Sequence, residues 1–140
     1  MTTAKKSRSI FVNLPVANLE KTKAFFQKLG FSFNAQFTDE KAACMVLSEL
    51  GYVMLLDRTF FKTFTKREIA GNQVSEALIA ISCENRAEVD QLVKTALENG
   101  GSPAMPPMDH GFMYASSFYD VDGHHWEVLW MDPAHVTPET

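Results

Sequence analysis

Residues 118–128 carry the sequence FYDVDGHHWEV, which predicts a strand, an acidic turn and a second strand. Asp122 and Gly123 are typical of a hairpin turn, because glycine adopts the positive φ that such turns need. Glu127 then lies within an apolar run, and a carboxylate there is costly to bury unless it is paired or bound. We expect Glu127 either to face water from an edge strand or to line a pocket.

Composition indicates one globular domain spanning residues 1–140, since 46% of the residues are apolar and 21% are charged. The net charge of −4 argues against nucleic acid as a partner, and we expect the basic residues Lys5, Lys6 and Arg8 to form a frayed tail. No apolar run approaches the ~20 residues of a membrane span, and no apolar leader segment is visible. We therefore expect a cytoplasmic protein that does not bind membranes.

Two cysteines, Cys44 and Cys83, are too few for a disulfide framework. Each lies in or beside an apolar strand. We expect both to be reduced thiols.

The two halves of the chain repeat one order of elements. In the first half we expect a strand over 10–16, a helix capped by Asn18 and ended by Gly30, and strands over 31–37, 42–47 and 52–56. In the second half we expect a strand over 77–82, a helix from Asn85 to Gly100, and strands over 102–105, 114–119 and 125–130. Residues 59–74 are expected to form a short helix or a flap.

This repeat predicts an α+β fold of two tandem βαβββ modules, about 9–58 and about 76–131. Paired edge to edge, the modules would form a cup-shaped mixed sheet with helices outside. Side chains from several strands would converge in such a cup.

Three segments carry a resemblance to a known family: residues 14–19, residues 25–31 and residues 120–127. On these motifs the chain resembles the vicinal oxygen chelate superfamily, which includes glyoxalase I, the extradiol dioxygenases and the fosfomycin and bleomycin resistance proteins. The resemblance covers about Ile10 to Met131 and implies a homodimer. Phe60, Phe61 and Phe64 are consistent with a dimer, because they are many aromatics for a solvated linker.

The resemblance also implies four metal-ligand positions. Here they hold Phe11, Met54 or Leu55, Leu78, and Glu127. A divalent transition metal needs three or four nitrogen, oxygen or sulfur donors, and only Glu127 is a suitable one. We therefore expect the usual metal site to be incomplete, with no cofactor.

A relocated metal site is the alternative. His110, His125 and Glu127 would make a set of two imidazoles and one carboxylate, with His125 and Glu127 on one face of a strand. His124 and His125 can equally be turn residues with solvated tips, and His110 can cap a loop.

Without a metal, Glu127 in an apolar cup can act as a general acid or base, since burial favours its neutral form. Its catalytic partner would be His110, His125 or Tyr114. Asn13 either binds the ligand or bonds to backbone. The segment 103–114 is expected to be a partial lid or a connector. The expected substrate-binding residues are Phe11, Asn13, Met54, Leu78, Phe112, Tyr114 and Trp126.

We therefore expect a protein that binds a small organic molecule, or a metal-independent enzyme of this superfamily. The alternative is a metal-dependent lyase resembling lactoylglutathione lyase, or a dioxygenase, with the relocated site.

Overall fold

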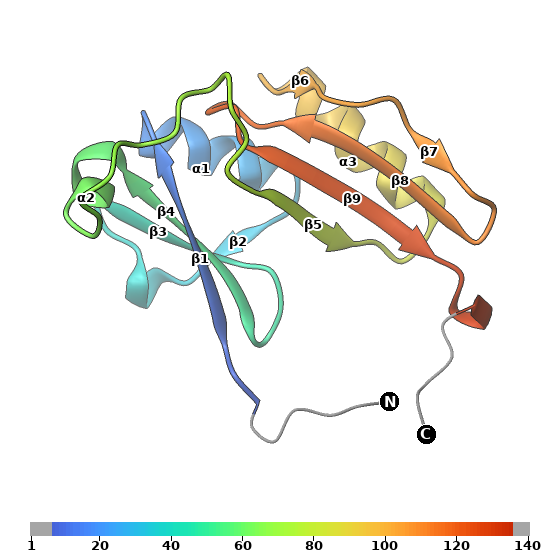
Figure 1. The fold of residues 1–140 in the computed structure, drawn as a ribbon. Helices are drawn as coiled ribbons and strands as arrows, with labels where there is room; N and C mark the ends of the chain where they lie inside the picture. Colours follow the sequence, from blue (N-terminus) through green and yellow to red (C-terminus); the bar gives the residue numbers. More distant parts are fainter. Residues whose placement is uncertain (1–6, 136–140) are drawn as a thin grey trace. The chain divides into compact units, whose positions relative to one another are not determined.

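The computed structural model describes residues 7–135, which form two compact units, residues 7–74 and residues 75–135 (Figure 1). Lys5 and Lys6 of the expected basic tail lie outside the described residues. Within the described range, no helix combines the length and the apolar character that crossing a membrane requires.

The N-terminal unit is a four-stranded mixed sheet in the order β1-β4-β3-β2. Strand β1 is parallel to β4, and the other pairs are antiparallel. Along the chain the elements are β1 (Ile10–Val16), α1 (Leu19–Lys28), β2 (Ser32–Phe33), a 3-10 helix η1 (Ala35–Phe37), β3 (Ala42–Val46), β4 (Gly51–Asp57) and α2 (Arg58–Lys62).

The C-terminal unit repeats this topology in a sheet of order β5-β9-β8-β6, with β7 also paired to β8. Strand β5 is parallel to β9, as β1 is to β4. Its elements are β5 (Leu78–Ser82), α3 (Arg86–Glu98), β6 (Ser102–Pro103), β7 (Met108–Asp109), β8 (Met113–Tyr119), β9 (His125–Met131) and a 3-10 helix η2 (Pro133–His135). The predicted α+β class with two βαβββ modules is confirmed, whereas the joined cup stays a prediction.

Local signals place the two long helices as predicted. The side chain of Asn18 accepts from the backbone N–H of Lys21, and that of Asn85 accepts from the N–H of Glu88. Glu88 reaches back to the N–H of Glu84, which completes a variant of the capping box. Gly30 follows α1 with a φ of +99°, where a side chain would strain the backbone.

The predicted strand over 31–37 is wrong beyond Phe33. The Asn34 side chain accepts from the N–H of Gln36, and the Asn34 carbonyl accepts from the Thr38 hydroxyl. Asparagine thus offers the backbone a turn in place of a sheet ladder, and η1 follows.

Segment 103–114, which is rich in proline, runs along the edge of β8 that does not pair with β9, as expected of a connector. Ser102 of β6 pairs with Tyr119, and Met108 of β7 pairs with Ala115. The predicted strand over 102–105 is therefore only two residues long, and β7 was not predicted. Residues 59–74 begin within the short helix α2, as one of the two alternatives expected.

Both cysteines are free thiols, as predicted. Cys44 is buried, and burial raises the pKa of its thiol. Burial, followed by the nearby charge of Glu88, raises the pKa of Cys83 to about 11. Neither thiol is therefore ionised at neutral pH.

Candidate functional site

The two faces of the C-terminal sheet have different surroundings. The Tyr114 hydroxyl donates to Asp90 of α3 at 2.6 Å, and the Arg86 guanidinium of α3 lies over the Tyr114 and Trp130 rings. Side chains alternate along a strand, so Trp126 shares this helix-facing side with Trp130 and is fully buried there. His125 therefore points to the opposite face, and so does Glu127.

On that opposite face, His125 and Glu127 are in close contact. Nε2 of His125 lies 3.4 Å from Oε2 of Glu127, and the exposed fractions of the two side chains are 8% and 35%. The distance between these two atoms is within the range of an ion pair, but their geometry does not meet the requirements of a hydrogen bond. Within residues 7–135, Nε2 is buried without any hydrogen-bond partner. An imidazole nitrogen at this distance forms a hydrogen bond only when it is aligned with its acceptor, so Glu127 does not satisfy Nε2 of His125.

Neighbouring strands extend this surface. The sheet register places Leu78 beside His125, and both Ala80 and Ser117 beside Glu127. The Ser117 hydroxyl accepts from the Met105 N–H at 2.9 Å, so it also fixes the connector. We call this surface the Glu127 face and define it by Leu78, Ala80, Ser117, His125 and Glu127. It combines one acid, one imidazole and one hydroxyl with the apolar side chains of Leu78 and Ala80, which suits a small ligand of mixed polarity.

The most buried carboxylate of the FYDVDGHHWEV stretch is Asp120, not Glu127. Asp120 is 3% exposed and accepts hydrogen bonds from the N–H groups of Asp122 and His124 and from the Trp126 indole. Burial raises the pKa of the Asp120 carboxyl, against the opposing effects of His124 and of these hydrogen bonds. Asp120 was not predicted as important, although an aspartate that opens a glycine turn is a known signal for such bonds.

The expected residues His110, Phe112 and Tyr114 lie at the other end of the β8–β9 pair. The His110 N–H donates to the Met113 carbonyl, and Met113 pairs with Met131, six positions along β9 from His125. At the rise of a strand, this separates His110 from His125 by about 20 Å. The structure therefore does not bring His110 together with His125 and Glu127.

In the N-terminal unit, the expected residues Phe11, Asn13 and Met54 share one sheet face. Asn13 pairs with Met54, and the Phe11 ring stacks on Tyr52 with centroids 4.9 Å apart. The Asn13 amide donates to the Phe11 carbonyl at 3.2 Å, which is the backbone-bonded alternative. This face is mainly apolar and aromatic.

The metal-ligand positions implied by the resemblance do not fit a metal. Phe11, Leu78 and either Met54 or Leu55 bring no nitrogen or oxygen donor to their strands, which leaves Glu127. No group of three or more histidine, cysteine, aspartate or glutamate side chains suited to a metal occurs in the part of the chain that the structure describes. On the face of β9 that they share, His125 and Glu127 can supply hydrogen bonding and proton transfer.

A second polar cluster was not predicted. Arg86 donates to both carboxylate oxygens of Asp109 at 2.8 Å and to the Gly111 carbonyl at 2.9 Å. The Arg86 hydrogen bond, then that from Gly111, lowers the pKa of Asp109 to about 2. The cluster joins the start of α3 to the loop that contains His110. Its partners are far apart in the sequence, so no local signal could have revealed it.

A bleomycin resistance protein-like N-terminal family model matches residues 8–48. Curated proteins include no match. A solved structure of a hypothetical protein, SA1046 from S. aureus, is 30% identical, with 87% of this chain and 92% of that one covered and a TM-score of 0.74.

Two more distant structures show the fold alone. A glyoxalase/bleomycin resistance protein/dioxygenase family enzyme from Burkholderia phytofirmans is 14% identical, covering 86% and 96% of the two chains, with a TM-score of 0.72. The fosfomycin resistance protein FosX from Listeria monocytogenes is 20% identical, covering 100% and 96%, with a TM-score of 0.62.

Proposed function

This chain belongs to the vicinal oxygen chelate superfamily, and from this premise we propose that it binds a small organic molecule on its Glu127 face without a metal. The observation that carries the proposal is the buried, unbonded Nε2 of His125 beside Glu127. A buried polar atom without a partner is costly, and a ligand atom can supply the missing hydrogen bond.

The pair can also move one proton. Glu127 can take a proton from a ligand hydroxyl or from an acidic carbon, while His125 Nε2 donates to or accepts from the ligand's oxygen. The two groups share one face of β9, two residues apart, so a ligand placed against one lies within reach of the other. In a pure binding protein the same atoms orient the ligand and no bond is broken.

Thermal-shift screening tests the binding. We expect a member of a panel containing fosfomycin, bleomycin and glutathione conjugates to raise the melting temperature of the wild type, because a ligand that binds only the native state stabilises it. Glu127→Gln should abolish the shift. Glu84→Gln, at an exposed acid two residues beyond the end of the neighbouring strand β5, is the matched control and should retain the shift. A ligand shift that survives both Glu127→Gln and His125→Gln would contradict the proposal.

Metal analysis of the purified protein separates this proposal from the alternative. A stoichiometric divalent ion that is lost on Glu127→Gln would overturn the metal-free site. It would favour a metal-dependent lyase or dioxygenase instead.

We also propose a homodimer. The apolar side chains Ile10 and Phe11 of β1 and Leu78 of β5 are exposed on strands that end their sheets. Edge strands with exposed apolar groups are normally covered by another chain or element. The aromatic residues of segment 59–74 give less support to a dimer than expected, because two of them already have contacts within the chain. The rings of Phe60 and Phe64 pack on each other with centroids 5.0 Å apart, and Lys41 lies over the Phe60 ring.

A further inference from the structure

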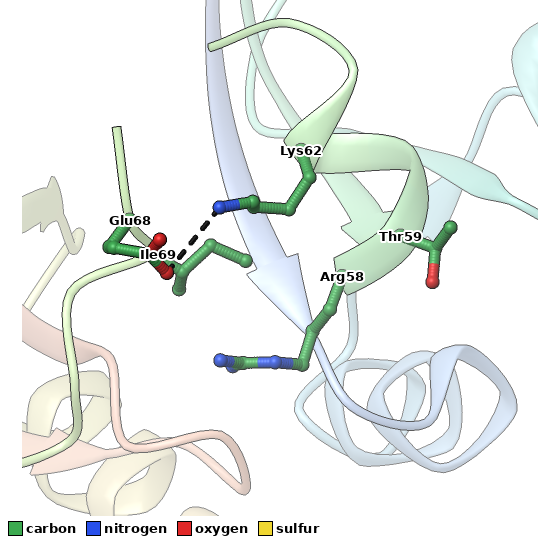
Figure 2. A pocket seen from close by; sticks show the side chains of 5 residues that line it. All are labelled: Arg58, Thr59, Lys62, Glu68 and Ile69. Atoms are coloured by element: carbon green, nitrogen blue, oxygen red, sulfur yellow. Dashed lines mark hydrogen bonds and ion pairs between the residues drawn. The ribbon is translucent and has the colours of Figure 1, made fainter. Parts of the chain in front are cut away.

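A basic hollow lies at α2 in the N-terminal unit. Its volume is about 240 Å³ and its lining comes from one short stretch of chain: Arg58, Thr59, Lys62, Glu68 and Ile69 (Figure 2). None of these residues belongs to the Glu127 face. We call this site the basic hollow.

The hollow contains a positive charge that its own residues do not neutralise. Arg58 and Lys62 are four positions apart on a helix, so their charges lie on one side of α2 and repel each other. Lys62 Nζ is 3.5 Å from Glu68 Oε2, but the Glu68 side chain is 95% exposed, so water screens this contact. The guanidinium of Arg58 has no ion-pair or hydrogen-bond partner among residues 7–135.

The surrounding sequence strengthens this charge. Lys66 and Arg67 follow α2, so the stretch 58–68 contains four cations and a single acid, Glu68. The whole chain has a net charge of −4. Positive charge concentrated against the overall balance raises the local concentration of anions.

We propose that the basic hollow binds the anionic group, phosphate or carboxylate, of a small organic molecule. Arg58 can offer two parallel N–H donors to such a group, and Lys62 adds a point charge. Ile69 provides an apolar wall for the adjoining carbon atoms, whereas the Thr59 hydroxyl points away from the two cationic groups (Figure 2). Glu68 holds Lys62 when the hollow is empty and is displaced by the ligand. This site goes beyond the proposed function, because it lies on another element and recognises another chemical group.

The experiment is an NMR titration of the ¹⁵N-labelled full chain with phenyl phosphate and, separately, with benzoate. We expect amide shifts at residues 58–69 that saturate at millimolar concentration in at least one arm, and the arm that saturates identifies the anionic group. Arg58→Gln and Lys62→Gln should each weaken binding roughly three- to tenfold, because each removes a charged donor. Glu68→Gln should tighten it about two- to fivefold, because it removes a competing carboxylate.

Lys66→Gln is the matched control, since it removes the same charge from the same stretch but outside the lining. It should change affinity less than about twofold, through diffuse charge alone. The proposal is overturned if neither probe shifts these amides, if Lys66→Gln weakens binding as much as Arg58→Gln, or if Glu68→Gln weakens binding. Glu127→Gln should leave these affinities unchanged, which keeps this test separate from that of the Glu127 face.

Discussion

The indole Nε1 of Trp126 donates a 2.9 Å hydrogen bond to Oδ2 of Asp120, six positions earlier in the chain. This bond joins the turn before β9 to the core residue between His125 and Glu127. Because the same carboxylate also accepts two backbone N–H groups, the turn and the start of β9 are held as one unit. The orientation of the candidate site therefore depends on a buried acid that does not belong to it.

Asp120→Ala should destabilise the protein by about 2–4 kcal/mol, because three donors lose their buried acceptor. Urea unfolding measures the change. Glu98→Gln, at the exposed end of α3, is the control and should stay within about 0.5 kcal/mol of the wild type. If Asp120→Ala lowers the free energy of unfolding no more than the control does, the hydrogen bonds of Asp120 contribute little to stability.

The Arg86–Asp109 pair should make stability depend on acid pH. The pKa of Asp109 is lowered to about 2 in the folded chain, below the ordinary value of 3.8. The contribution of this group is therefore complete above about pH 4 and is lost as the pH falls toward 2. Urea midpoints of the wild type and of Asp109→Asn should differ at pH 5 and converge near pH 2.

Glu76→Gln serves as the control for this pH series, since Glu76 is exposed and lies before β5. Its midpoint should follow that of the wild type throughout. A difference between the wild type and Asp109→Asn that persists unchanged at pH 2 would rule out the ion pair as its source.

Gly100→Ala should destabilise by about 1–2 kcal/mol. Its φ is +105°, and an added Cβ would lie 3.1 Å from Cγ1 of Val121, so backbone strain and crowding add together. Gly71→Ala is matched to it, because a Cβ there meets nothing within 4 Å and its φ is not in the left-handed region. Thermal unfolding should separate the two variants, and equal melting temperatures would contradict the strain.

Light scattering after size exclusion should give twice the mass of one chain, as expected of a homodimer. Phe11→Ser together with Leu78→Ser should shift the protein toward monomer, because exposed apolar groups on edge strands favour association. Met131→Ser, an exposed apolar residue at the end of β9, is the comparison and should keep the wild-type mass. A wild-type protein that is monomeric at all concentrations would contradict the proposed homodimer.

Local chemistry determined which elements form and where they begin. Asn18 and Asn85 cap their helices because their side chains satisfy free N–H groups within four residues, and Gly30 ends a helix through its own φ. The α+β class and the repeat followed from such signals. The prediction of a strand over 31–37 is wrong beyond Phe33, because the turn that the Asn34 side chain favours ends the strand there.

Only the tertiary structure decided which side chains meet. The distance of His110 from His125 depends on the β8–β9 register, and the burial of Trp126 depends on α3 covering that face. Arg86 meets Asp109 across 23 positions, and Asp120 loses its water only when the core closes over it. These contacts join residues that are distant in the chain or set by packing, and neither periodicity nor composition contains that information.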